Sequence, residues 1–466
     1  MARAGEVTVG IDIGTTSTKA LAVDGDGRVQ ARARIPHALV VSAPDRMEHQ
    51  PNRAWRRGPR RALASLGAVR PRGVCVAAVV PSLTAVDRRG LARTPGLLYG
   101  DVRGRTPLAD AGSMLNGELE ALLAWTSAQA PSAMGYWPAQ AVANHALAGE
   151  GVIDATTAQA SFPLFNGRHW NEDRARSAGA RLDQLPKVAG TGAACGRIDD
   201  AILCAGAVDA MAEQLVAGAD HVGDVLVICG TTLLTWVVVD TWREVPGLWT
   251  VPHTVPGLFL VGGPSVAGGL FLSWVGRMLG RKGAPVEPGR VPVWAPYPRG
   301  ERTPLHDPHR RAMLSDLDLT HDASAVQRAA YEASGFVVRH HIDLSGVAPR
   351  RLVATGGGVN APAWVQALAD CTELPVDVVT VPEGGALGAA FLARLAAGLE
   401  SSIYDAARWA RTGRLVEPDR AWVGPARERY LRFRALSERP SELIANGTEE
   451  EPTPPWSRPR GPSSSS

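Results

Sequence analysis

The sequence predicts an α/β fold made of two related halves, and three features support this prediction. A strand–turn–strand pattern runs from Val7 to Asp24, and a similar pattern returns at residues 226–240. Between residues 351 and 371, a predicted strand runs into three glycines and then a helix. Strands and helices that alternate in this way are typical of α/β proteins. With 466 residues and 45% apolar composition, the chain is long enough to bury two sizeable cores.

The first pattern predicts an antiparallel hairpin. Apolar residues alternate with smaller or polar ones up to Asp12, which indicates a half-buried strand. Gly14-Thr15-Thr16 then turns the chain, and Thr18 to Val23 predicts a second strand that pairs back on the first. The tip of this hairpin carries four polar residues: Asp12, Thr15, Thr16 and Lys19.

These four residues match the chemistry of a phosphate site. A glycine-threonine tip offers backbone N–H and hydroxyl donors, Lys19 offers a compact positive charge, and Asp12 offers a hard oxygen ligand for hydrated magnesium. An ordinary hairpin with a polar tip explains the short motif equally well. Lys19, however, is one of three lysines among 49 lysines and arginines, which favours a specific use of the ammonium group here.

The second hairpin repeats the first at a constant distance. The segment LVICGTTLLTWVVVD at 226–240 places Gly230 216 residues after Gly14, and Asp240 216 residues after Asp24. Each half is therefore predicted to begin with the same hairpin. Ile228 stands where the first half has Asp12, so the two halves share a scaffold but differ in chemistry.

The DIGTTSTK tip, the second GTT hairpin, the ATGGG segment and the Gly-Glu-Arg-Thr-Pro run within 298–304 together resemble the FGGY carbohydrate kinases. The resemblance extends from about Val7 to about Gly398. It implies two ribonuclease-H-like domains of the actin and hexokinase type around an interdomain cleft. We expect a sugar- and phosphate-side domain at 6–220 and a nucleotide-side domain at 221–437. The Pro-, Ser- and Glu-rich residues 438–466 predict a disordered tail.

The resemblance also assigns a general base. Asp209 lies in the small-residue segment AGAVDAMAEQLVAG, shortly before the second hairpin, where the family carries the aspartate that accepts a proton from the sugar. From the residues alone, an aspartate at a helix start would more often be an N-cap. Relatives usually follow the base with an amide residue, whereas Ala210 follows it here.

The nucleotide and metal contacts that the resemblance implies are spread over both halves. ATP would be bound from one side by Thr15, Thr16 and Lys19, and from the other by Gly230, Thr231 and Thr232. The glycine run of Gly356, Gly357 and Gly358 would line the adenosine site, since glycine allows close backbone approach. Asp12 would hold magnesium at the phosphates.

The sugar side departs from the family pattern. We expect Ser82, Asp101 and Arg103 to contact the sugar. Pro81-Ser82-Leu83 lacks the histidine of many relatives, and Tyr99-Gly100 replaces their tryptophan-asparagine. The overall match is nearest to the xylulokinase-like branch, which implies a pentulose such as xylulose. The loss of polar partners predicts a less hydroxylated or differently arranged substrate, or modest selectivity among ketoses and polyols.

Composition and charge argue against several other classes of protein. A net charge of +3 argues against dedicated nucleic-acid binding, and five scattered cysteines without CxxC spacing predict reduced thiols. The apolar run Val225–Val239 is too short to span a bilayer, and no secretory leader is recognisable. We therefore expect a cytoplasmic protein, monomeric or homodimeric, that binds no membrane.

Two other functions fit the same scaffold. A non-catalytic regulator that binds sugar or nucleotide would explain the altered sugar motifs, although it would not need both Asp12 and Asp209. An actin-like or chaperone-like ATPase would need no sugar base. The dependence of ATP turnover on added sugar separates the three, because only a kinase requires it.

Overall fold

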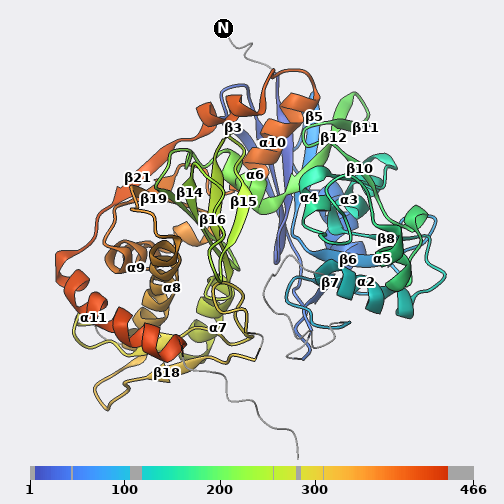
Figure 1. Ribbon diagram of the computed structural model, residues 1–466. Coiled ribbons are helices and arrows are strands. Elements are labelled where there is room, and N and C mark those ends of the chain that lie inside the picture. Colours follow the sequence, from blue (N-terminus) through green and yellow to red (C-terminus); the bar gives the residue numbers. More distant parts are fainter. Residues whose placement is uncertain are drawn as a thin grey trace, which may run out of the picture.

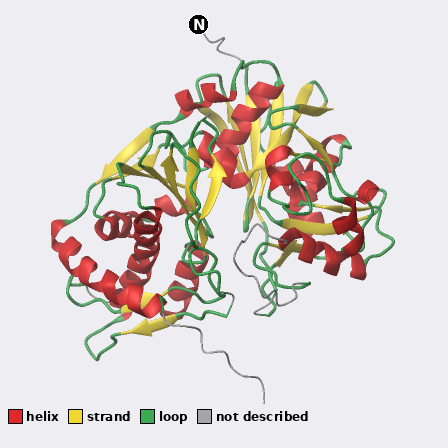
Figure 2. Ribbon diagram, viewed as in Figure 1, coloured by secondary structure: helices red, strands yellow, loops and turns green. Residues whose placement is uncertain are grey.

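The computed structural model describes residues 6–43, 46–104, 118–255, 257–279, 285–307 and 309–438. It has two lobes, each built on a mixed sheet, that meet near helices α6 and α10 (Figure 1). Helices pack beside the sheets of both lobes (Figure 2). Within the described ranges, no helix has both the length and the apolar character needed to cross a membrane. Residues 439–466 of the predicted tail lie outside the description.

The first sheet contains the predicted hairpin. Its order is β11-β12-β5-β1-β2-β3. The strands are β1 (Thr8–Ile13), β2 (Ser17–Val23), β3 (Val29–Pro36), β5 (Gly73–Ala78), β11 (Ala194–Ile198) and β12 (Ala201–Val208). Every residue of β1 and β5 is buried, because both faces of the sheet centre are covered. β1 and β2 pair antiparallel with Asp12 opposite Lys19, as expected for the hairpin.

The second sheet repeats this arrangement. Its order is β15-β16-β14-β13-β19-β20-β21. The strands are β13 (Asp224–Cys229), β14 (Leu233–Val239), β15 (Trp249–Pro252), β16 (Phe259–Ser265), β19 (Arg351–Thr355), β20 (Val376–Val379) and β21 (Thr412–Val416). The strands β16-β14-β13-β19-β20 have the same order and directions as β3-β2-β1-β5-β12. The predicted repeat is therefore a repeat of topology.

The remaining elements surround these sheets. The α-helices are α1 (Gly58–Ala64), α2 (Glu118–Gln129), α3 (Ala139–Ala148), α4 (Ala155–Gln159), α5 (Glu172–Ser177), α6 (Asp209–Leu215), α7 (Gly269–Leu279), α8 (Ala323–Ser345), α9 (Pro362–Thr372), α10 (Gly384–Ala396) and α11 (Arg420–Ser437). Shorter helical segments are η1 (Asn52–Arg57), η2 (Leu182–Gln184), η3 (Gly357–Asn360) and η4 (Ile403–Trp409). Small sheets contain β4 (Glu48–His49), β6 (Ser82–Val86), β7 (Gly96–Leu98), β8 (Gly135–Trp137), β9 (Val152–Asp154), β10 (Lys187–Ala189), β17 (Val293–Ala295) and β18 (Met313–Ser315).

Helices α6 and α10 occupy equivalent places in the two repeats and pack against each other. α6 follows β12, and α10 comes after β20. A Cβ atom on Gly388 of α10 would lie 1.8 Å from the Ala212 carbonyl oxygen of α6, so only glycine permits this approach. Gly10 of β1 allows the same closeness to the Ala386 carbonyl oxygen. The two repeats are thus joined through directly touching backbones.

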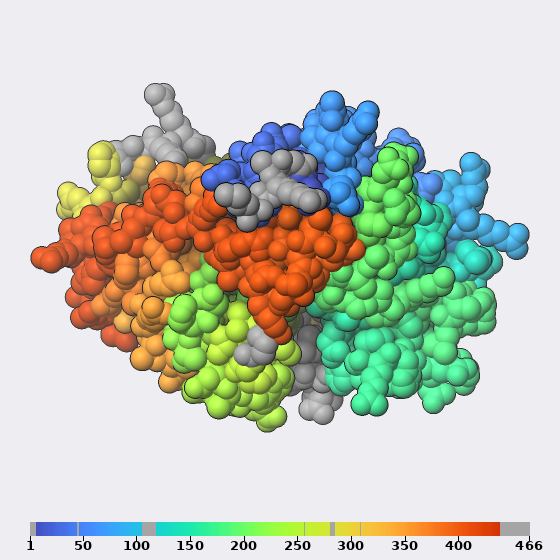
Figure 3. Space-filling model, turned by 90° about the horizontal axis from the view of Figure 1, so that it is seen from above, coloured from blue at the N-terminus to red at the C-terminus, as the bar shows by residue number. Residues whose placement is uncertain are grey.

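The packing of α10 crosses the predicted domain division. α10 lies late in the chain, yet Ala386, Ala390 and Phe391 share a buried cluster with Leu21 and Cys75 of the first sheet. Viewed from above, the orange surface that follows α10 lies between the blue N-terminal strands and the green middle of the chain (Figure 3). The expected domain boundary at residue 220 therefore stays a prediction.

Candidate active site

The tip of the first hairpin presents a buried carboxylate beside an ammonium group. Asp12, at 6% exposure, lies near the end of β1 and accepts a hydrogen bond of 3.3 Å from Lys19 Nζ on β2. Asp12 Oδ1 is buried and has no hydrogen-bond partner among the described residues. A Cβ atom on Gly385 of α10 would come within 3.2 Å of Asp12 Cγ, so the helix start closes over this carboxylate.

The unpartnered oxygen makes Asp12 a fitting metal ligand. A buried carboxylate oxygen without a donor is costly, and a hydrated divalent cation would supply the missing positive charge. Lys19 Nζ contacts only the other oxygen, Oδ2, and leaves Oδ1 open to a second cation. The pKa of Lys19 is raised, chiefly by Asp12, with further contributions from Glu213 and Glu383, so the ammonium group stays charged. The residues present therefore suit the predicted magnesium.

The threonines of the two hairpin tips meet directly. Thr15 Oγ1 lies 2.8 Å from Thr231 Oγ1, and the Tyr99 hydroxyl lies 3.3 Å from Thr15 Oγ1. Thr16 is exposed and Thr232 is partly exposed at the same junction. The structure thus brings together the two GTT segments that the sequence placed 216 residues apart.

The glycine run lies beside the second tip because β13 and β19 are parallel neighbours. Gly230 follows β13, and Gly356 follows β19. Gly356 has a φ of 87°, and a Cβ atom there would lie 2.9 Å from the Cys229 carbonyl oxygen. Gly358 packs against the Trp364 ring, whereas Gly357 is exposed with open space around it. Gly356 and Gly358 are therefore tightly packed against the protein, whereas the backbone at Gly357 is open to solvent.

Asp209 is the first residue of α6 and does not act as its N-cap. Val208 holds the cap position, and no side chain caps this helix. Among the described residues, Asp209 Oδ1 accepts only the N–H of Ala210, at 2.7 Å. Part of the residue reaches solvent, but neighbouring groups enclose the carboxyl and raise its pKa to about 8. Burial is the main cause, followed by the charge of Asp12; the Ala210 N–H and Lys19 act in the opposite direction.

Glu213 was not expected at this site. It lies one helical turn after Asp209 and accepts a 2.8 Å hydrogen bond from Thr355 Oγ1 at the end of β19. Burial raises its pKa to about 7. The sequence signal that could have indicated Glu213 is its spacing of four residues from Asp209, because residues four apart share one face of a helix. Its link to Thr355 joins the first repeat to the second.

The side chains of the three residues predicted to contact the sugar form hydrogen bonds or ion pairs with other protein groups. Ser82 Oγ accepts the Ala139 N–H at 3.0 Å, at the start of α3. Asp101 is fully buried and pairs with Arg103 through Nε at 2.9 Å and Nη2 at 2.6 Å. Arg103 also pairs with Glu48 and lies over the Trp125 ring. Contact of these residues with a sugar stays a prediction.

The Gly-Glu-Arg-Thr-Pro segment reaches across to the first repeat. Glu301 is held by Ser265 Oγ and the Arg302 N–H, both at 2.6 Å. Arg302 Nη2 lies 3.5 Å from Glu118 Oε2 and over the rings of Tyr99 and Trp249. The segment therefore contacts residues of the first half of the chain and forms part of the wall between the two repeats.

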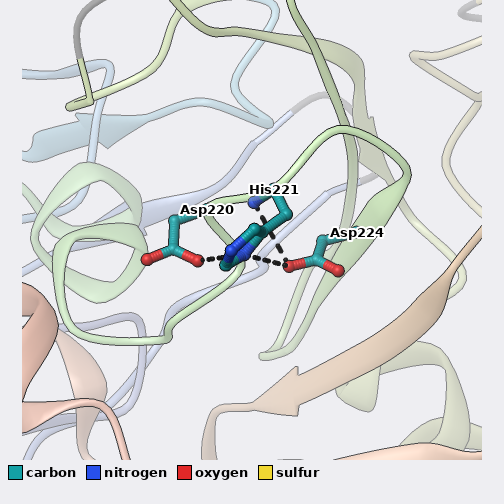
Figure 4. A group of neighbouring side chains, drawn as sticks. All are labelled: Asp220, His221 and Asp224. Carbon is teal, nitrogen blue, oxygen red and sulfur yellow. Dashed lines mark hydrogen bonds and ion pairs between the residues drawn. The ribbon is translucent and has the colours of Figure 1, made fainter.

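A second group of ligand-type side chains lies at the start of the second repeat. Asp220, His221 and Asp224 lie close together (Figure 4). His221 Nδ1 is 2.8 Å from Asp220 Oδ1, and Asp224 accepts from Arg351 Nε at 3.1 Å and Nη2 at 3.2 Å. Because Arg351 already neutralises Asp224, the group is an ion-pair network and no metal centre is assigned to it.

Comparisons with known proteins point to one family. Residues 7–80 match the N-terminal domain, and residues 225–397 the C-terminal domain, of the FGGY family of carbohydrate kinases. The chain is 30% identical to the xylulose kinase of Streptomyces coelicolor, over 87% of this chain and 91% of that protein. It is 24% identical to the gluconokinase of Bacillus subtilis, over 84% and 87%.

The solved structures show the same fold. The crystal structure of xylulose kinase from Rhodospirillum rubrum has a TM-score of 0.73 and 27% identity, and the match covers 92% of this chain and 98% of that one. Two domain matches that together span more than half of the chain, and a full-length relative at 30% identity, lead to one conclusion. This protein belongs to the FGGY family of carbohydrate kinases.

Proposed function

We propose that this carbohydrate kinase transfers the γ-phosphoryl group of Mg·ATP to a hydroxyl of a small sugar or polyol, with Asp209 as the general base. The observation that carries the proposal is the convergence of Asp209, Asp12 and both GTT tips where the two repeats meet. Asp12 raises the pKa of Asp209 and Lys19 lowers it, which supports a shared role for the three charged groups.

Each residue has a task that suits phosphoryl transfer, in which positioning and charge neutralisation dominate. Asp209 in its ionised form accepts the proton of the attacking hydroxyl, and a raised pKa increases the proton affinity of that carboxylate. Asp12 would hold magnesium, which supplies positive charge at the phosphates when it is bound. Lys19 and the hydroxyls of Thr15 and Thr231 bind phosphate oxygens. Gly356 to Gly358 receive the adenosine.

The substrate proposal is a five-carbon ketose, with xylulose as the first candidate. It rests on the named relatives, several of which are xylulose kinases, although a gluconokinase and a ribulokinase also match. It also rests on Pro81-Ser82-Leu83 and Ala210, which stand where many relatives carry polar residues. A pocket with few polar partners selects weakly among hydroxylated ligands. We therefore propose modest selectivity among ketoses and polyols.

A substrate panel tests both parts of the proposal. Initial rates of ADP release are measured with tetritols, pentuloses, pentitols, hexuloses and gluconate at equal concentration. A kinase releases ADP only when an acceptor is present. A single strong preference for one sugar would contradict the weak selectivity. No sugar-dependent ADP release on any member would favour a non-catalytic regulator.

The role of Asp209 is tested by Asp209→Asn. A positioned general base contributes roughly two to four powers of ten in turnover, so we expect a loss of that size with Mg·ADP binding retained. The matched control is Asp322→Asn at the start of α8, where the aspartate caps the Ser324 and Ala325 N–H groups. This control should keep full turnover, since asparagine also caps well. An Asp209→Asn protein with near-normal turnover would remove the assignment.

A further inference from the structure

Two histidines lie directly behind the first phosphate-binding tip. His37 follows β3, and His49 ends β4. Their side chains are almost completely buried, at 8% and 1% exposure, and their rings touch edge to face with centroids 4.6 Å apart. Neither residue belongs to the motifs that identify the nucleotide site.

Both rings hold backbone carbonyls of the tip. His37 Nε2 lies 3.0 Å from the Gly14 carbonyl oxygen, and His49 Nε2 lies 2.7 Å from the Thr15 carbonyl oxygen. The backbone N–H of His37 donates to the next carbonyl, that of Thr16, at 3.0 Å. The two histidines therefore bind three consecutive carbonyl groups of the tip.

Holding the carbonyls also sets the direction of the N–H groups. In a trans peptide the C=O and N–H bonds point in opposite directions. When His37 and His49 bind the carbonyls of Gly14 and Thr15, the N–H groups of Thr15 and Thr16 point the other way. In the described part of the chain, neither of these N–H groups has a hydrogen-bond partner. Two neighbouring N–H donors without protein partners can both bind one anion.

The orientation of His49 is itself fixed by the core. Trp55 Nε1 donates to His49 Nδ1 at 2.9 Å. An indole N–H can only donate, so His49 Nδ1 must accept and the proton must lie on Nε2, facing Thr15. Trp55 is fully buried, and a Cβ atom on Gly96 would lie 2.4 Å from its ring, which leaves it no room to turn.

We propose that His37 and His49 are positioning residues for nucleotide phosphate. They act through the tip, by presenting the Thr15 and Thr16 N–H groups to the phosphate as a preformed pair of donors. This inference rests on the proposed function, because it takes the tip to be a phosphate site. It adds two residues and a core tryptophan to the machinery that binds ATP.

The test compares leucine with glutamine at position 49. Glutamine can place a side-chain Nε2 donor near that of histidine, whereas leucine removes the donor and leaves the Thr15 carbonyl without a partner. Loss of one buried hydrogen bond corresponds to about tenfold in affinity. We expect His49→Leu to raise the Kd for Mg·ADP about tenfold by calorimetry, and His49→Gln to stay within about threefold of the wild type. The KM for the sugar should change little in both.

A second pair, His37→Leu and His37→Gln, repeats the comparison at Gly14 and serves if His49→Leu does not fold. Thermal midpoints verify folding in each variant. If the wild type binds Mg·ADP and both leucine variants bind it equally well, the inference is overturned and the proposed function stands. Glutamine variants as weak as the leucine variants, at equal thermal stability, overturn it as well. A wild type that binds no nucleotide overturns the proposed function.

Discussion

Thr15 and Thr231 occupy the same position in two repeats, and their hydroxyl oxygens lie 2.8 Å apart. Each hydroxyl is the side chain that its hairpin tip presents to the junction, so the topological repeat ends in a direct contact. A phosphate group that receives a hydrogen bond from both threonines must lie against this pair. Under the proposed function, both repeats would therefore act on one ligand.

A double-mutant cycle tests this coupling. Thr15→Val and Thr231→Val should each lower kcat/KM for ATP by about tenfold or more, because hydrogen bonds to charged groups are worth about 1.5–3 kcal/mol. Residues in contact show interaction energies of about 0.5 kcal/mol or more, so the double variant should lose less than the sum. Thr15→Ser and Thr231→Ser keep the hydroxyl and serve as controls. Strictly additive losses would show that the threonines act separately.

The close approach of α6 and α10 predicts a sharp cost for one added methyl group. Gly388→Ala places a Cβ atom 1.8 Å from the Ala212 carbonyl oxygen, and neither backbone can move easily. Overpacking of this kind costs about 1–3 kcal/mol, measured as a drop in the free energy of unfolding by urea. The matched control is Gly276→Ala on the exposed side of α7, where the Gln327 amide oxygen, at 3.3 Å, is the one described atom within 4 Å of the added Cβ.

The control should be neutral or more stable by about 0.5–1 kcal/mol, since alanine favours helix. Equal stability of the two alanine variants would contradict the close packing of α6 on α10.

Because His49 is buried, we expect the free energy of unfolding to fall in acid. Burial lowers its pKa to about 4, and the nearby His37 contributes in the same direction. A histidine whose pKa is lower in the folded state contributes stability that is fully present above its ordinary value of 6.5 and is lost as the pH falls through 6.5 toward 4. The loss by pH 5 is about 1–2 kcal/mol relative to pH 7.5.

The measurement is the free energy of unfolding at pH 7.5, 6 and 5 for the wild type and His49→Gln. Glutamine does not titrate, so the variant should lose less stability over this range. Parallel curves for the two proteins would show that His49 does not titrate as its surroundings require.

Arg299 links the two repeats through hydrogen bonds. Its Nη2 donates to the Gly100 carbonyl at 3.0 Å and to the Arg46 carbonyl at 3.3 Å, so a residue of the second repeat grips the first. We expect small-angle scattering to show a more compact wild type with sugar and a non-hydrolysable ATP analogue than without ligands, because closure excludes water from the phosphate.

Arg299→Ala should reduce this compaction and raise the KM for the sugar more than it lowers kcat. Arg60→Ala, on the exposed side of α1, is the matched arginine control. If ligands leave the size of the wild type unchanged, closure is not part of the cycle.

The sequence by itself determined the elements and their repeat. Alternating apolar residues and the Gly-Thr-Thr turns predicted both hairpins, and the structure confirms β1 with β2 and β13 with β14. The small-residue segment around Asp209 predicted the start of α6, and the structure places that start at Asp209. Local patterns suffice here, because strand period, turn chemistry and helix starts depend on residues only a few positions apart.

Only the tertiary structure decided which of these residues meet. Thr15 and Thr231 are 216 residues apart, Glu213 and Thr355 are 142 apart, and His49 lies 34 residues from the carbonyl it binds. It also brought Glu48 to Arg103, 55 residues away along the chain. No local pattern encodes such pairs, because they form when two sheets and their crossing helices pack, and burial then fixes hydrogen-bond partners that a solvated chain would not need.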